Sequence, residues 1–426
     1  MILNFEEFRK TNESGHDLDK IRVKNFDIFQ KKGLPSKKEE NWKYTDLKTI
    51  INKSLNKLEI LNEKTLQYNH EWLIKNFDHN QIILLNGNFV KSNFNFEDEK
   101  KIKINPLKNV LKDKKYFDKL KDFFVDQKNS LEILNHALAN DGIILEVENN
   151  YSFNKPLIIY NFFDKDSENK VINNKFCISL GNDTKLNILE YYKSENKVKY
   201  FNNVVHNYHL KKNSILKRFN VNNNLDNSYN YHLTNVKSYS NSIFENFLFS
   251  SGSNQIKNEI HCDLLESFGS CFINGVIFLD SKQHHELKTN INHKYEHCKS
   301  SQLIKSVLLD NSKGTYQGKI YVDKNAQKTN GYQLSKALVL SDSSEFNSKP
   351  ELEIYADDVK CSHGSTTGNI DENSVFYLMS RGLSKDQAKK MLVEGFLNEA
   401  IETITEENIK SLIFELFINR INQIKI

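Results

Sequence analysis

The feature that most constrains this chain is a long series of short apolar or alternating segments between residue 143 and about residue 355. Examples are residues 143–147, 176–180, 272–276 and 352–355, and clusters of Asn, Asp, Ser and Gly separate them. Such segments are typical of β-strands bounded by turns. No segment of helical period interrupts the series, which excludes a βαβ design, because parallel strands of that kind need a helix between them.

Three architectures remain for this region: a β-sandwich, a β-barrel and a stacked β-solenoid. A solenoid accepts indefinite repetition, because each coil buries its face on the next. A single sandwich of this length would be unusual. The sequence shows no strict repeat motif, so it favours the solenoid and leaves the other two open.

Segments of helical period flank the strands on both sides. Leucines and aromatic residues recur at helical spacing between about 105 and 140, and again from about 372 to the end. Ser384 and Gln387 have the spacing of a capping box, and residues 81–90 read as a strand entering a tight turn. We therefore predict an N-terminal, mainly helical unit (1–142), a β core (143–371) and a C-terminal helical unit (372–426).

Charge and cysteine content narrow the class of protein. The chain has 59 basic and 55 acidic residues, intermixed, with a net charge of +4, whereas a nucleic-acid binder usually gathers its cations into one patch. Five cysteines without a Cys-x-x-Cys pair fit a reducing compartment. The N-terminus does not resemble a signal peptide, and no apolar stretch approaches the ~18 residues that cross a bilayer. We expect a cytoplasmic protein that contacts neither membrane nor nucleic acid.

Motifs for common enzyme chemistry are missing from the sequence. It contains no P-loop, no Gly-x-Gly-x-x-Gly, no Gly-x-Ser-x-Gly and no His-Glu-x-x-His. Cys361 and His363 would share one face of a strand, and a thiol beside an imidazole suits iron, zinc or copper(I). Two ligands are fewer than the usual four, so a buried cysteine beside a hydrogen-bonded histidine is the alternative. His284 and His285 would point to opposite faces, as surface or core residues.

Several segments together resemble one known family. Residues 350–368, which include Cys361-Ser362-His363-Gly364, and residues 376–383 are similar to the C-terminal part of the SufB/SufD family. Two upstream segments also resemble it: residues 40–45, Glu-Asn-Trp-Lys-Tyr-Thr, and residues 134–138, Leu-Asn-His-Ala-Leu. The resemblance runs through the whole chain in order, and the middle matches mainly in character.

The resemblance favours the SufD branch over the SufB branch. Cys-Ser-His-Gly at 361–364 is similar to the SufD form, whereas SufB has a His-Glu pair there. SufB also carries a cysteine directly after a glutamine, and here Gln333-Leu334-Ser335 has leucine at that position. Leucine neither ligates iron nor carries persulfide sulfur, so a SufB-like partner would supply the thiol.

The SufD-type resemblance implies a right-handed parallel β-helix core between helical N- and C-terminal domains. It also implies a non-catalytic subunit that works with a SufB-type subunit and the SufC ATPase in iron–sulfur cluster assembly, or forms a homodimer when alone. By the same analogy His363, and less strongly Cys361, would meet a transient cluster at the SufB-type interface, with no cofactor bound stably by the chain alone. Phe376, Tyr377 and Arg381 would lie in or beside the SufC docking region.

Two alternatives for the function stay open at this point. One is a SufB-like homodimeric scaffold, which would hold a stable cluster on this chain alone. The other is a β-solenoid carbohydrate-active protein, since β-solenoids often act on acidic sugars.

Overall fold

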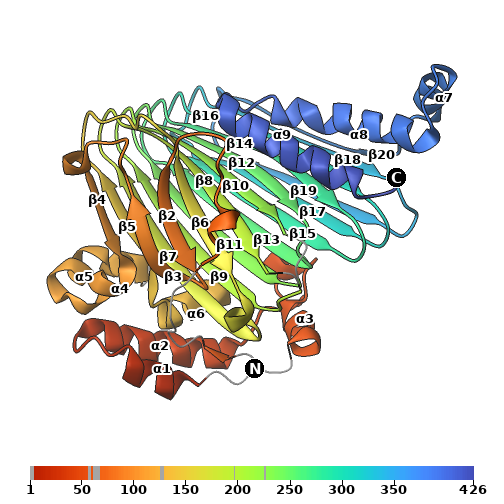
Figure 1. The fold of residues 1–426 in the computed structure, drawn as a ribbon. Helices are drawn as coiled ribbons and strands as arrows, with labels where there is room; N and C mark the ends of the chain where they lie inside the picture. Colours follow the sequence, from red (N-terminus) through yellow and green to blue (C-terminus); the bar gives the residue numbers. More distant parts are fainter. Residues whose placement is uncertain (1–3, 56–58, 61–67, 125–128, 196, 225–226) are drawn as a thin grey trace.

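A computed structural model describes residues 4–55, 59–60, 68–124, 129–195, 197–224 and 227–426. Its centre is a parallel β-solenoid of about eight turns, with helices at both ends (Figure 1). From β5 onward the chain alternates between two ten-stranded sheets, so each of the strands β7 to β18 pairs with the strand two positions earlier and the strand two positions later. The predicted mainly β, solenoid fold is therefore confirmed.

Both sheets run from an antiparallel N-terminal end to a parallel C-terminal end. Sheet A consists, in order, of β4 (Ile102–Pro106), β5 (Asp141–Val147), β7 (Lys170–Leu180), β9 (Phe201–Leu210), β11 (Tyr229–Ser238), β13 (Gln255–Leu264), β15 (His284–His293), β17 (Lys313–Val322) and β19 (Glu345–Ile354), with β1 (Glu59–Ile60) beside β7. Sheet B consists of β3 (Asn88–Asn93), β2 (Asn80–Leu85), β6 (Leu157–Phe163), β8 (Lys185–Ser194), β10 (Ile215–Asn223), β12 (Ile243–Ser251), β14 (Ser270–Leu279), β16 (Lys299–Leu308), β18 (Asn330–Val339) and β20 (Lys360–Gly368). Only β2–β3 and β4–β5 pair antiparallel among the described strands. The sheets thus begin within residues 1–142, and the division into three units stays a prediction.

The turns between coils explain the Asn, Asp and Ser clusters. Asn213 and Asn241 adopt left-handed backbone conformations, with φ of 57° and 55°, which asparagine tolerates better than most residues. The next residue turns its hydroxyl inward: Ser214 Oγ donates to the Lys211 carbonyl at 2.6 Å, and Ser242 Oγ makes the equivalent bond. These two turns therefore satisfy the serine hydroxyl within the turn itself.

The inside of the solenoid holds one continuous apolar core. Alternate residues of each strand point inward, and in-register pairing stacks them in columns across coils, as in Leu216, Phe244 and Cys271. All three are fully buried. This stacking buries apolar side chains between coils, and it stabilises the solenoid without a βαβ crossover.

The N-terminal helices cover the outer face of sheet A (Figure 1). They are α1 (Phe5–Thr11), α2 (Asp17–Lys32), α3 (Leu47–Ser54), α4 (Leu107–Lys112), α5 (Lys114–Leu120) and α6 (Ser130–Leu138). Short 3-10 turns lie at Glu40–Trp42, His70–Trp72, Glu99–Lys101, Lys121–Phe124 and Lys165–Ser167, and the turn at His70–Trp72 packs against sheet B. Leu131 and Leu134 of α6 share an apolar cluster with Phe201 and Leu233 of the sheet. The helical period predicted between about 105 and 140 is confirmed.

Residues 40–45 cross the outer face of sheet A towards its C-terminal end. Trp42 is buried, and its ring lies 4.5 Å from the Lys257 ammonium. The Thr45 hydroxyl donates to Glu286 at 2.6 Å, and Lys349 of β19 pairs with Glu40 at 2.8 Å. This segment therefore ties the N-terminal part of the chain to strands β13 to β19.

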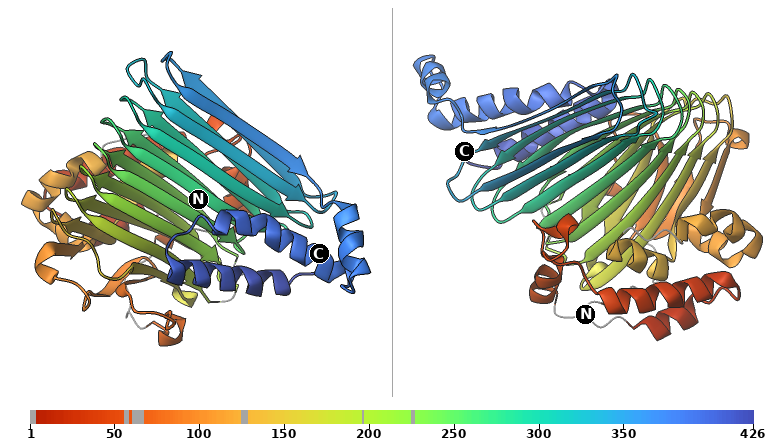
Figure 2. Two further views of the ribbon diagram at one scale, coloured as in Figure 1. Left: turned by 90° about the horizontal axis from the view of Figure 1, so that it is seen from above. Right: turned by 180° about the vertical axis from the view of Figure 1, so that it is seen from behind.

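The C-terminal helices α8 (Lys385–Ile401) and α9 (Glu407–Asn422) cover the outer face of sheet B, and α7 (Glu372–Ser380) projects beyond the last strands (Figure 2). The α9 ring of Phe417 lies 6.1 Å from that of Phe278 on the sheet. Ser384 and Gln387 form the predicted capping box at the start of α8. No helix in the described part of the chain is long and apolar enough to cross a membrane.

Candidate subunit and cluster site at the open end of the solenoid

The C-terminal end of the solenoid is open. Strands β19 and β20 stand last in their sheets, and each pairs with one neighbouring strand among the described residues. An edge strand leaves alternate backbone N–H and C=O groups free to pair with another chain. The open end is therefore the place where a second subunit could continue the sheets.

Cys361 and His363 lie on the last strand, β20, and point the same way. The register places Cys361 over Gly331 and His363 over Gln333. Gln333 is an inward-facing residue that is 2% exposed. Since residues in register share a face, both side chains look into the mouth of the solenoid, as the Cys-x-His spacing predicts.

Cys361 is half-buried at this mouth, and the other four cysteines are buried. It packs beside a small cluster of Ile320, Val322 and Ala326. Burial raises the pKa of the Cys361 thiol, so the thiol is protonated at neutral pH. Iron would have to displace that proton, because metal ligands bind deprotonated.

His363 is exposed to solvent on β20. Among the residues that the structure describes, no three His, Cys, Asp or Glu side chains are grouped closely enough to hold a metal ion. An iron ligand set at His363 would therefore need side chains from another subunit. The metal roles of His363 and Cys361 stay predictions.

The other neighbouring Cys and His residues do not meet. Cys262 is buried in the solenoid core, while His261 faces outward, 3.6 Å from Glu259. His285 is buried and bonds the Ser250 hydroxyl and the Ser253 carbonyl, whereas His284 faces the other way. His284 and His285 therefore point to opposite faces of the strand, as predicted.

The predicted docking residues lie on or just after α7, beyond the open end (Figure 1). Phe376 is 74% exposed and Tyr377 is 57% exposed. The Arg381 guanidinium lies 5.2 Å from the Tyr377 ring centre and donates to its hydroxyl at 3.3 Å. Exposed aromatic residues gathered on one short helix are the kind of surface that a partner protein covers, and the docking role of these residues stays a prediction.

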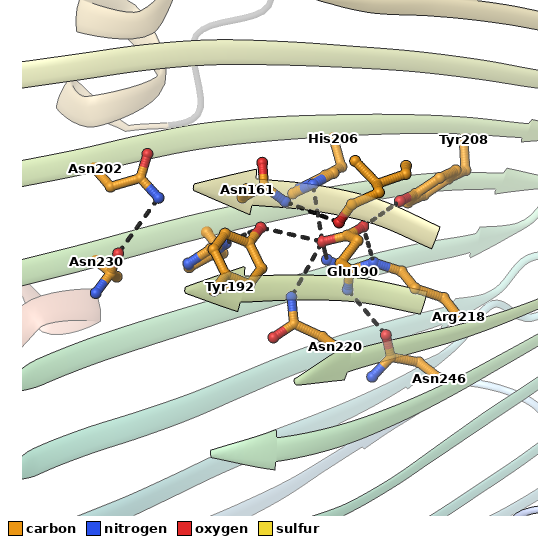
Figure 3. Close-up of polar contacts among 12 residues, drawn as sticks. Asn161, Glu190, Tyr192, Asn202, His206, Tyr208, Arg218, Asn220, Asn230 and Asn246 are labelled. Atoms are coloured by element: carbon orange, nitrogen blue, oxygen red, sulfur yellow. Dashed lines mark hydrogen bonds and ion pairs between the residues drawn. The ribbon is translucent and has the colours of Figure 1, made fainter. Parts of the chain in front are cut away.

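Sequence reasoning missed a polar network inside the solenoid, centred on Glu190 (Figure 3). The Arg218 guanidinium donates two parallel hydrogen bonds to this carboxylate, of 2.7 and 2.8 Å, and its third N–H group donates to Asn246 at 2.9 Å. Tyr208 and Asn220 also donate to Glu190, at 2.9 and 3.1 Å. These five side chains come from strands β8, β9, β10 and β12, so the network joins successive coils.

The electrostatics of this network follow from burial and from the Glu190–Arg218 pair. Burial alone would raise the pKa of Glu190, but Arg218, and then His206, hold it well below its usual value. Burial lowers the pKa of His206, and that of His232 to about 3. The Glu190–Arg218 ion pair therefore lies among neutral groups, and the network links successive coils of the solenoid from the inside. One sequence signal could have revealed this network. Glu190 and Arg218 carry opposite charges at inward-facing positions of two strands, 28 residues apart.

Comparison with known proteins agrees with this structure. The family described as "SUF system FeS cluster assembly, SufBD core domain" matches residues 162–396, and the "SufBD protein N-terminal region" matches residues 4–159. The iron–sulfur cluster assembly protein SufD of Escherichia coli is 25% identical over 89% of this chain and 87% of its own length.

Two other relatives extend the range of the similarity. An iron–sulfur cluster assembly SufBD family protein of Synechocystis is 24% identical over 89% of this chain and 85% of its own. The chloroplastic protein ABCI7 of Arabidopsis thaliana is 37% identical over 26% of this chain and 24% of its own. Because the core-domain match alone spans more than half of the residues, the chain belongs to the SufB/SufD family of iron–sulfur cluster assembly proteins.

Proposed function

We propose that this chain is a SufD-type subunit that assembles iron–sulfur clusters together with a SufB-type subunit and a SufC-type ATPase. In this role it catalyses no reaction of its own. It supplies a rigid solenoid, an imidazole at the subunit contact and a helix on which the ATPase docks. Five free cysteines suit a reducing compartment such as the cytoplasm.

The open end of the solenoid carries this proposal. Strands β19 and β20 offer unpaired edges, and His363 and Cys361 point into the mouth between them. A subunit that paired with these edges would cover both side chains. A ligand set incomplete on this chain would then be completed at the contact, which is what a cluster built between two subunits requires.

The cluster is cargo in this scheme, and the residues of this chain act on it as transient ligands. His363, being exposed, offers a nitrogen ligand without rearrangement. Cys361 is protonated at rest because burial raises its pKa, so it would bind only after iron takes the place of the proton. His363 is therefore the principal ligand proposed, and Cys361 the secondary one.

The test is to co-express the chain with SufB-type and SufC-type proteins and to measure iron and sulfide in the purified complex. His363→Ala should lower both by more than half while the subunits still co-purify, because one ligand is missing from a four-ligand site. His297→Ala is the matched control, because His297 is also exposed and lies on a turn away from the open end. Cluster content in His363→Ala equal to that of His297→Ala would refute the ligand role.

The docking role of α7 is tested separately. Alanine at Phe376, Tyr377 and Arg381 together should abolish co-purification of the ATPase, because three exposed contact residues are lost while α7 keeps its buried Val375. Phe268→Ala removes an equally exposed ring, 53% exposed, from a turn of the solenoid and should leave binding unchanged. Retention of the ATPase by the triple variant would remove α7 as the docking site.

A SufB-like homodimer is the alternative outcome, since the same open edges could pair two copies of this chain. A dimeric mass for the chain alone, together with a stable cluster after reconstitution, would favour it. A monomer, or a dimer without a cluster, favours the SufD-type role.

A further inference from the structure

We propose that Gln333 is a positioning residue for His363. Its side-chain carbonyl accepts a hydrogen bond from one ring N–H of the imidazole, which leaves the other ring nitrogen with its lone pair towards a partner. This inference rests on the proposed function, because it names the group that orients the proposed ligand. The orienting group lies inside the solenoid, one coil below the open end.

A column of polar side chains runs inside the solenoid to His363. In-register pairing places Gln302 of β16 under Gln333 of β18, and Gln333 under His363 of β20. Neighbouring strands of a sheet lie about 4.8 Å apart, so each side chain of the column is within reach of the next. One coil earlier the same column holds Ile273, which is fully buried. The fold therefore accepts an apolar residue in this column, and the two glutamines need another explanation.

The hydrogen bond to Glu351 determines how the Gln333 amide is turned. The Gln333 Nε2 atom donates to the Glu351 carbonyl of β19 at 3.4 Å. A carbonyl oxygen only accepts hydrogen bonds, so the nitrogen end of the amide faces β19 and its oxygen, Oε1, faces the inside of the solenoid. Gln333 is 2% exposed, so bulk water has little access to this oxygen.

The Gln333 oxygen keeps a lone pair for a further donor. Among the described residues its donor is the Tyr316 hydroxyl of β17, at 3.5 Å. Tyr316 has one hydroxyl proton, and its contact with Gln302 Oε1 is shorter, at 2.9 Å. The Thr289 hydroxyl also donates to Gln302 Oε1, at 2.6 Å. Since a carbonyl oxygen has two lone pairs, Gln333 can accept from a donor above it while Gln302 accepts from the two hydroxyls.

Gly318 of β17 gives the amide its space. A Cβ at this position would collide with Gln333 Oε1 and with the Tyr316 hydroxyl oxygen. The backbone of Gly318 is outside the left-handed region, so its conformation does not require glycine. The missing side chain is what allows the carbonyl of Gln333 to occupy this place.

His363 supplies the donor that the Gln333 oxygen lacks. Its ring is exposed, lies one strand above Gln333 on the same face, and makes no hydrogen bond to any residue that the structure describes. A neutral imidazole carries one N–H and one lone pair, and the hydrogen bond made by one nitrogen decides which nitrogen can bind a metal. With its N–H on Gln333, His363 would present a single nitrogen to iron at the open end.

The first test uses the chain alone, labelled with ¹⁵N-histidine and measured by NMR at pH 8. The His363 signals are assigned by their loss in His363→Ala. One ring nitrogen should show the shift of an N–H group and the other that of a lone pair, because one tautomer dominates. Gln333→Leu should move both shifts towards the average of the two tautomers. Gly318→Ala should act in the same direction, since it displaces Oε1 and leaves the glutamine in place.

Ser335→Ala is the matched control for this test. Ser335 is also buried and faces inward on β18, but it lies under Ser365 instead of His363, so the His363 shifts should stay as in the wild type. Wild-type shifts in Gln333→Leu, or averaged shifts already present in the wild type, would overturn the proposal.

The second test uses the complex with the SufB-type and SufC-type subunits. Release of iron to the chelator ferrozine should be about tenfold faster or more in Gln333→Leu, because the loss of a hydrogen bond to a ligating histidine weakens metal binding by about 10–100-fold. Ser335→Ala should release iron at the wild-type rate. Equal rates in Gln333→Leu and Ser335→Ala would contradict the positioning role in the complex.

The two tests separate this inference from the proposed function. If His363→Ala keeps its full cluster content, the ligand role fails, and the NMR experiment still decides whether Gln333 fixes the tautomer of His363. If His363→Ala loses the cluster while Gln333→Leu leaves the NMR shifts unchanged, this inference alone is wrong.

Discussion

Replacing Arg218 by Met tests whether the Glu190 network braces the solenoid. Glu190 and Arg218 are 1% and 2% exposed, and the substitution removes both guanidinium bonds to the carboxylate and the bond to Asn246. Breaking a buried ion pair on one side costs about 3–5 kcal/mol, because the remaining charge is left uncompensated. Met has a similar length, so the cavity left behind is small.

The sign of the pH dependence follows from the pKa of Glu190. In the wild type this pKa lies well below its usual value, so the stabilisation is complete above the unfolded pKa of about 4.3 and is lost as the pH falls through the folded pKa. In Arg218→Met, burial would instead raise the pKa of Glu190 above its unfolded value. The folded state then gains from protonation, and the penalty should be smaller at pH 5 than at pH 8.

Urea unfolding of Arg218→Met at pH 8 and pH 5 measures both quantities. We expect a loss of about 3–5 kcal/mol at pH 8 that shrinks by up to about 1.4 kcal/mol per pH unit through the titration of Glu190. Glu190→Gln combined with Arg218→Met should recover most of the loss, since a neutral pair leaves no buried charge. Arg9→Met, which removes a surface pair with Glu6, should cost less than about 1 kcal/mol. A loss below about 1 kcal/mol, or one equal at both pH values, would refute the brace.

Two further predictions concern packing and thiol exposure. Gly252→Ala should prevent soluble expression or cost at least about 2 kcal/mol of unfolding free energy in urea, because φ is 93° and a Cβ would lie 1.9 Å from the Asn224 carbonyl oxygen. Gly395→Ala in α8 is the control. A Cβ there meets nothing within 4 Å, so this change should stabilise the chain by about 0.5–1 kcal/mol. Colorimetric thiol titration of the native chain should find one reactive cysteine, Cys361, and five after denaturation, since the other four are buried; two or more fast thiols in the folded chain would contradict the burial.

The solenoid could be predicted from the sequence, but its coils could not be counted. The absence of helical period between the strands was sufficient to exclude βαβ topology. A repeat motif is hidden because the coils differ in length: Ile243 pairs with Ser270, 27 residues on, whereas Lys299 pairs with Asn330, 31 residues on. The inward-facing columns also contain apolar, hydroxyl and thiol side chains, so no consensus residue identifies these positions.

The candidate site could be predicted in part, because it depends on residues that are close together in the sequence. Cys361 and His363 share a face as strand alternation requires, and the capping box at Ser384 follows from four residues. The Glu190–Arg218 pair joins strands 28 residues apart, and its meaning depends on the register between coils. Local periodicity carries no information on that register, so the network was found only in the structure.

The central claim is that the open end of the solenoid is where this chain meets its assembly partner. Amide hydrogen exchange of β19 and β20, in the free chain and in the complex with a SufB-type subunit, tests it most directly. The account predicts that exchange slows by about tenfold or more in these two strands, because new backbone hydrogen bonds cover their edges. A complex that forms while β19 and β20 exchange as fast as in the free chain would contradict it.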